Sequence, residues 1–312
     1  MIIHTGLRTD IPAFYAEWLA NRLREGYVCV RNPYSPASVT KYRLSPDVVD
    51  LIVFCTKNPS PLLPRMDLLK SYGQYWFVTI TPYGRDIEPH VPDKRFIIRT
   101  FQKLSRLVGA DSMAWRYDPI LLTGEWTIRR HLSAFGEIAA QLEGYTHTCV
   151  ISFLDLYRKV LRNFPEGRTV SEEERLALGR EMIRMADSHR MVLRTCAEGT
   201  ELAPYGADCS GCMTARIFEK AVHEKLQLPK KKTARRECAC FLTNDIGAYD
   251  SCGHLCRYCY ANANPEAVRR NMLLHDPSSP FLIGSFRPDD RIHTALQKSW
   301  LDRQLSLRDF MP

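Results

Sequence analysis

Cysteine is the residue type in this 312-residue chain with the clearest capacity for chemistry, because eight of its eleven copies fall within 64 positions. The chain begins Met1-Ile-Ile-His-Thr-Gly, which lacks a basic segment followed by a long apolar run, so we expect a cytoplasmic protein. In a reducing compartment, clustered thiols are metal ligands or catalytic groups more often than disulfides. The eight are Cys196, Cys209, Cys212, Cys238, Cys240, Cys252, Cys256 and Cys259.

The sharpest pattern is Cys252-Gly-His-Leu-Cys256-Arg-Tyr258-Cys259. Its C-x3-C-x2-C spacing, with an aromatic residue directly before the last cysteine, resembles the motif of radical S-adenosylmethionine (SAM) enzymes. Thiolates hold iron–sulfur clusters, and three of them fix three irons of a [4Fe–4S] cube. The resemblance implies that the fourth iron binds SAM, whose reductive cleavage yields a 5′-deoxyadenosyl radical. Zinc is the alternative, with His254 or Cys240 as the fourth ligand.

The upstream cysteines predict a second metal centre. We expect Cys196, Cys212, Cys238 and Cys240 to bind an auxiliary iron–sulfur cluster, with Cys209 as a substitute ligand. Zinc in the same four-thiolate cage remains an alternative, because the donor set hardly separates the two. The other three cysteines lie in strand-like runs and are expected to be inert core thiols. They are Cys29, Cys55 and Cys149.

Short β-like runs alternate with helical patterns through the first two hundred residues, which predicts a parallel sheet. The expected strands are Ile2–Thr5, Leu51–Thr56, Tyr75–Thr81, Ser112–Arg116, Thr146–Ser152 and Met191–Cys196. The expected helices are Ile11–Glu25, Asp93–Val108, Ile128–Leu142 and Ser171–Ser188.

Polar side chains follow or end these strands, as they do around the active sites of β/α barrels. We expect them to surround SAM and the substrate, with Lys57, Arg116 and Asp118 as catalytic residues. Arg8, Lys57 or Arg116 would pair with the methionyl carboxylate, although Arg116 and Asp118 could instead form a structural ion pair. The expected cofactor-binding residues are Arg8, Asp10, Asn58, Thr79 and Thr81, with Tyr258 placed near the adenine by the radical SAM resemblance.

Five segments together resemble a bacterial family called domain of unknown function 1848, over about residues 1–265. That family carries a radical-SAM-like cysteine triad near its C-terminus. Two shorter stretches, Phe54–Pro59 and Arg116–Ile120, are similar to the spore photoproduct lyase branch of radical SAM enzymes. The five segments are Arg8–Tyr15, Val30–Pro33, Val53–Pro59, Tyr117–Ile120 and Asp245–Asn262.

The position of the triad departs from the radical SAM pattern, which places it after the first barrel strand. A circular permutation would reconcile the two, with Asp245–Tyr249 as the first strand and Asn264–Leu274 as its helix. We therefore expect an α/β fold, a partial (β/α)6 TIM-type barrel with a cysteine-rich metal-binding insert. The expected divisions are barrel units at 1–196, an auxiliary-cluster segment at 197–244, and the triad with C-terminal helices at 245–312.

The formal charge, 43 − 35 = +8, is a weak sign of a polyanionic partner. The longest apolar stretch, Leu51–Cys55, is too short to span a membrane. We expect a radical SAM enzyme, a lyase or transferase, with nucleic acid among its candidate substrates and a flavodoxin or ferredoxin as electron donor. Two alternatives stay open: a zinc-stabilised nucleic-acid-binding module, and an iron–sulfur electron-transfer protein without its own substrate.

Overall fold

A parallel sheet of seven strands forms the centre of the computed structural model, which describes residues 1–229, 240–241 and 244–302. The strands lie in the order β8-β7-β6-β5-β4-β1-β9, and every neighbouring pair is parallel. Chain order and spatial order agree from β1 to β8, while β9 returns to pair with β1. The strands are β1 Ile2–His4, β4 Leu51–Thr56, β5 Gly73–Thr79, β6 Met113–Ile120, β7 Thr148–Phe153, β8 Val192–Thr195 and β9 Asn244–Asp245.

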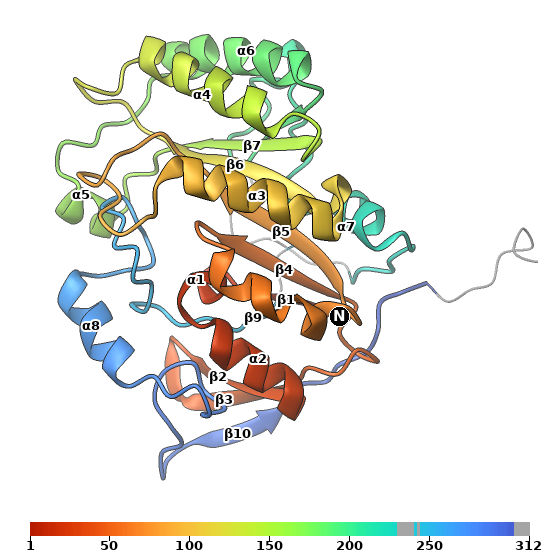
Figure 1. The fold of residues 1–312 in the computed structure, drawn as a ribbon. Coiled ribbons are helices and arrows are strands. Elements are labelled where there is room, and N and C mark those ends of the chain that lie inside the picture. The colour runs from red at the N-terminus through yellow and green to blue at the C-terminus, as the bar shows by residue number, and fades with distance from the viewer. Residues whose placement is uncertain (230–239, 242–243, 303–312) are drawn as a thin grey trace, which may run out of the picture.

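Helices follow most of these strands, and Figure 1 shows α3, α4 and α6 together on one side of the sheet. Side-chain caps stabilise the first turns of two long helices. The Asp93 carboxylate accepts hydrogen bonds from backbone N–H groups of α3, and Ser171 with Glu174 forms a capping box on α6. The helices are α1 Ile11–Phe14, α2 Ala16–Glu25, α3 Lys94–Val108, α4 Ile128–Leu142, α5 Arg158–Asn163, α6 Glu172–Ser188, α7 Ala215–Val222 and α8 Pro265–Leu273. Short 3-10 helices span Ser60–Leu69, Ala110–Ser112 and Ala203–Tyr205.

Both faces of the central strands are buried, because successive side chains point in opposite directions. Ile52, Phe54 and Trp76 join the larger core under the helices. Val53 and Tyr75 belong to a second core, which includes Phe218 of α7 and the thiols of Cys212 and Cys240. Cys212 and Cys240 of the cysteine-rich segment therefore pack against the second face of the sheet.

A small second sheet was not predicted from the sequence. It has the order β10-β3-β2, with β2 Tyr27–Asn32, β3 Ser35–Arg43 and β10 Arg291–Thr294. The antiparallel β2–β3 hairpin is local, whereas β10 joins β3 in parallel from 253 residues further along the chain (291 − 38). The hairpin matters for the site, since its turn forms part of a cavity wall.

The α/β class and the parallel sheet are confirmed, and the sheet is open, with β8 and β9 as its edges among the described strands. The expected helix Ile11–Glu25 is instead split in two at Tyr15, which has a non-helical backbone and donates from its hydroxyl to the Ser251 carbonyl at 2.6 Å. The predicted strand at Asp245–Tyr249 is shorter and starts one residue earlier. No helix in the described part of the chain has the length and apolar character to cross a lipid bilayer.

Candidate functional site

A cavity of about 730 Å³ lies at the carboxyl ends of the parallel strands. Its wall takes residues that follow or end each of them, including Asp10 after β1, Lys57 after β4, Thr79 of β5 and Cys196 after β8. This is the edge of a parallel sheet at which α/β proteins bind ligands. The strand ends that the sequence pointed to therefore converge on one site.

The triad Cys252, Cys256 and Cys259 lines this cavity. Cys256 is buried, and the other two are half-buried. Their loop follows β9 and is closed by backbone contacts, with Asp250 N donating to Ala261 O at 3.1 Å. Burial raises the pKa of all three thiols, and each also interacts electrostatically with another member of the triad.

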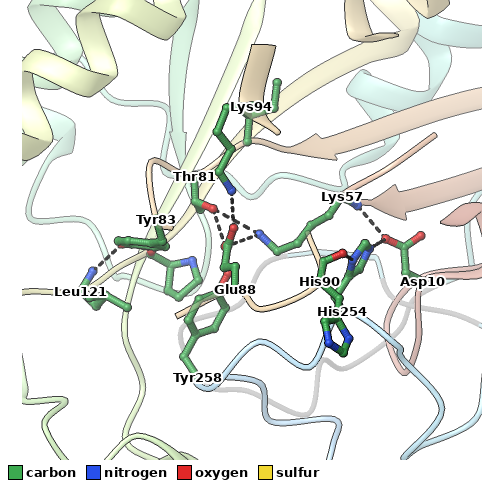
Figure 2. Close-up of polar contacts among 12 residues, drawn as sticks. Asp10, Lys57, Thr81, Tyr83, Glu88, His90, Lys94, Leu121, His254 and Tyr258 are labelled. Atoms are coloured by element: carbon green, nitrogen blue, oxygen red, sulfur yellow. Dashed lines mark hydrogen bonds and ion pairs between the residues drawn. The ribbon is translucent and has the colours of Figure 1, made fainter. Parts of the chain in front are cut away.

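Asp10 connects the triad loop to the N-terminus of α1. Its carboxylate accepts from the Lys57 backbone N–H at 2.7 Å, shares a 2.9 Å hydrogen bond with His254 Nε2, and caps α1 through Ala13 N–H. The other ring nitrogen of His254 faces the His90 carbonyl at 3.4 Å (Figure 2). Both nitrogens of His254 are therefore engaged within the protein, so it is not placed as a fourth metal ligand.

Glu88 is a buried carboxylate at the centre of a polar cluster beside the triad (Figure 2). It accepts from Lys57 Nζ at 2.8 Å and Thr81 Oγ1 at 2.5 Å, and also from Lys94 and the Tyr258 hydroxyl. Burial alone would raise the pKa of Glu88, but the two lysines outweigh it and lower the pKa to about 2. The motif tyrosine is thus held by an ionised carboxylate.

Arg116 connects the strand ends to the second group of thiols. It forms an ion pair with Asp118 and donates to Cys196 Sγ at 3.5 Å, while Asp118 accepts from Ser152. A hydrogen bond from Cys212 lowers the pKa of Cys196, and Arg116 lowers it further against the effect of burial. This arrangement favours a thiolate at Cys196.

Cys212 and Cys240 lie side by side next to Cys196, with 3.3 Å between their sulfur atoms, and all three line the cavity. Cys238, the fourth expected ligand, lies outside the described residues, as does the basic run 230–236. Cys209 is absent from the cavity wall. The structure therefore brings three of the four preferred auxiliary ligands together.

Within residues 1–229, 240–241 and 244–302, no group of three or more His, Cys, Asp or Glu side chains is arranged to hold a single metal ion. Ligands of an iron–sulfur cube bind different irons, so their sulfurs do not need to converge on one point. Three thiols around one cavity, with His254 turned away to Asp10, fit a cluster of that kind. The donor set is compatible with the expected cofactor.

Most of the predicted site residues reach the cavity, but two do not. Asn58 accepts from Ser60 N–H at 3.2 Å within a turn, and Thr81 is buried behind the wall against Glu88. Those that line the cavity are Arg8, Asp10, Lys57, Thr79, Arg116, Asp118 and Tyr258. Three of these cations form ion pairs with carboxylates of the protein: Arg8 with Asp245, Lys57 with Glu88, and Arg116 with Asp118.

Sequence reasoning missed two parts of the site. Glu88 and Asp245 organise the lysines and Arg8, but neither was assigned a role from the sequence, because these ion pairs form only in the folded chain. Cys29, Cys55 and Cys149 were all expected to be inert core thiols. Cys29 and Cys149 are buried, but Cys55 is half-buried in the cavity wall. Its position next to the carboxyl end of β4 was the available signal.

The fold and site are those of an α/β protein with a thiol-rich cavity at the carboxyl edge of a parallel sheet. The family described as "Domain of unknown function (DUF1848)" matches residues 2–261, so the chain belongs to this family. No curated protein matches the chain.

Proposed function

We propose that this protein is a radical SAM enzyme whose triad Cys252, Cys256 and Cys259 binds a [4Fe–4S] cluster. One observation carries the proposal: three motif thiols line a cavity at the carboxyl ends of the strands, and the fourth-ligand candidates for zinc are engaged elsewhere. When bound, the cluster and SAM would supply a 5′-deoxyadenosyl radical that abstracts hydrogen from a substrate.

The chain's own residues would orient and enclose these groups. Asp10 and His254 hold the triad loop in place, and Glu88 fixes Tyr258 beside it. Arg116 lies between Asp118 and Cys196, where it would orient the substrate in the cavity. Cys196, Cys212, Cys238 and Cys240 would hold an auxiliary cluster, for which zinc is the competing metal.

Strand order supports a permuted radical SAM barrel. Read across the sheet from one edge, the order is β9, β1, β4, β5, β6, β7, β8. If the segment from Asn244 onward preceded Met1, chain order and spatial order would agree throughout, and the triad would follow the first strand. We infer a partial barrel of this type in a cytoplasmic enzyme that takes electrons from a small donor such as flavodoxin or ferredoxin.

The test is SAM cleavage by anaerobically reconstituted protein with dithionite. We expect 5′-deoxyadenosine from the wild type and none from Cys256→Ala. Cys29→Ala is the matched control, because Cys29 is a buried thiol of β2 in the small sheet, packed with Val39 and Phe281. Equal cleavage by wild type and Cys256→Ala would refute the assignment of the triad, and an iron-free protein containing zinc would favour a structural metal site.

A further inference from the structure

Four tyrosines line the cavity of the proposed enzyme near its opening: Tyr34, Tyr157, Tyr249 and Tyr260. Tyr34 is 88% exposed, Tyr260 43% and Tyr157 39%, whereas Tyr258 and the sulfurs of Cys212 and Cys240 are buried. This gradient places the tyrosines at the outer end of the cavity and the thiols at its inner end. We call these four residues the tyrosine rim.

The rim gathers rings from four separate segments. Tyr34 follows β2, Tyr157 precedes α5, Tyr249 follows β9 and Tyr260 follows the triad. The rings of Tyr157 and Tyr260 lie 6.2 Å apart, and Tyr34 interacts with Tyr249. Large aromatic rings left open to solvent around one cavity mark a binding surface more than a folding requirement.

Two hydroxyl groups of the rim are held by other groups of the protein, which leaves the ring faces as the main binding feature of these tyrosines. Tyr260 donates to the Leu7 carbonyl at 2.6 Å, and Tyr157 donates to Asp155 at 3.0 Å. Fixed rings suit the stacking of a planar ligand, because little side-chain freedom is lost on binding.

Positive charge accompanies the rim on α5. Lys159 Nζ lies 5.5 Å from the centre of the Tyr249 ring and interacts electrostatically with Cys259. Arg158, its neighbour in the chain, is exposed. Asp155 contributes one negative charge nearby, and Arg8 is already paired with Asp245. The rim therefore combines aromatic faces with a modest excess of cations.

We infer that the tyrosine rim binds a nucleobase, with its phosphate directed toward Lys159 and Arg158. This inference rests on the proposed function, since it names the substrate class of the same cavity. Base–aromatic stacking with adjacent cations is how proteins hold unpaired bases. A cavity of about 730 Å³ has the size of a small-ligand pocket, so a base must enter it unpaired, either on a free nucleotide or on a single strand.

The experiment measures binding by the reconstituted protein without SAM or reductant. The probes are thymidine monophosphate, a labelled oligothymidylate of about ten nucleotides, and the same strand in a duplex. Thymine is chosen because an adenine probe could occupy a site for SAM. We expect the single strand or the free nucleotide to bind, and the duplex to bind at least about fivefold more weakly.

Variants assign the binding to the rim. Tyr34→Ala should weaken binding by at least about fivefold, while Tyr34→Phe should retain it, because the ring does the stacking. Tyr205→Ala is the matched control, since Tyr205 is 42% exposed but lies outside the cavity wall. Affinity for the strand should fall only about three- to sevenfold between about 50 and 200 mM salt, as one or two phosphate contacts predict.

The inference is overturned if neither thymidine probe binds, if the duplex binds as well as the strand, or if Tyr34→Ala binds like wild type. SAM cleavage on the same preparation separates the two proposals. SAM cleavage without binding of a thymidine probe refutes nucleobase binding by the tyrosine rim and leaves the radical SAM assignment intact. Thymidine binding without cleavage supports the rim and refutes the assignment.

Discussion

Asp10 and His254, 244 residues apart in the sequence, are joined by a 2.9 Å hydrogen bond between Oδ2 and Nε2. Asp10 is also the N-cap of the first helix, and His254 stands inside the cysteine triad. The start of the chain thus positions the loop on which the proposed cluster depends. This contact explains how a motif near residue 252 can be built onto strands that precede it.

Asp10→Ala should reduce both stability and iron retention. The change removes a helix cap and leaves the Lys57 N–H and His254 without their acceptor, so we expect a loss of about 2 kcal/mol of unfolding free energy. Asp93→Ala, which removes only the cap of α3, should cost about 1 kcal/mol and leave iron unchanged. Urea unfolding and iron content after gel filtration are the measurements. Equal iron in the two variants would contradict the anchoring role.

Glu88→Gln should be strongly destabilising, because it leaves the half-buried ammonium groups of Lys57 and Lys94 without their carboxylate. We expect a loss of about 3–5 kcal/mol at pH 7. The folded-state pKa is about 2 against 4.5 for the free group, so the stabilisation is complete above about pH 5 and is lost as pH falls toward 2. Urea midpoints of wild type and variant should therefore converge below pH 4. A constant difference from pH 7 to pH 3 would show that the carboxylate charge is not responsible.

Glu198 should give the opposite pH dependence. Burial raises its pKa to about 8, while its carboxyl accepts from Phe153 N–H at 2.9 Å. The folded state therefore holds a proton that the unfolded state releases above about pH 4.5, so stability falls as pH rises from 5 to 8. Glu198→Gln keeps a hydrogen-bond acceptor and removes the titrating group. The unfolding free energy of the variant minus that of the wild type should therefore be about 1–3 kcal/mol larger at pH 8 than at pH 5. Parallel slopes for the two proteins would refute this.

Gly6→Ala should disturb the cavity floor. A Cβ at this position would lie 2.1 Å from the Cys55 carbonyl oxygen, a backbone atom that cannot rotate away. We expect a loss of about 1–3 kcal/mol, measured by thermal unfolding under anaerobic conditions. Gly124→Ala is the matched control, because an added Cβ there meets no atom within 4 Å. A Gly6→Ala protein as stable as the control would show that this close approach is not required.

Local patterns in the sequence were sufficient to predict the central strands and the long helices. The apolar run Leu51–Thr56 is a strand with the predicted bounds, and α4 also begins and ends as expected. The small sheet could not be found in this way, because β10 pairs with β3 across 253 residues (291 − 38). The interruption at Tyr15 depends on the distant Ser251 carbonyl, which no local pattern reveals.

The residues of the candidate site could be predicted where reactive residue types cluster in the sequence. They could not be predicted where single residues from distant segments meet only in the fold. The triad and the strand-end cations could be recognised from spacing and position. Glu88 could not be singled out, since its role arises only when Lys57, Lys94 and Tyr258 meet around it. The tyrosine rim was missed for the same reason.

The central claim is that three thiols hold a four-iron cluster with one iron open to SAM. Electron paramagnetic resonance of the dithionite-reduced, anaerobically reconstituted protein tests it most directly, with spectra recorded before and after SAM is added. We predict a [4Fe–4S] signal with a component that changes shape when SAM is added. Cys256→Ala should lose this SAM-responsive component and keep any signal from the auxiliary cluster. A spectrum that SAM leaves unchanged, or a protein that binds zinc and no iron, would contradict the account.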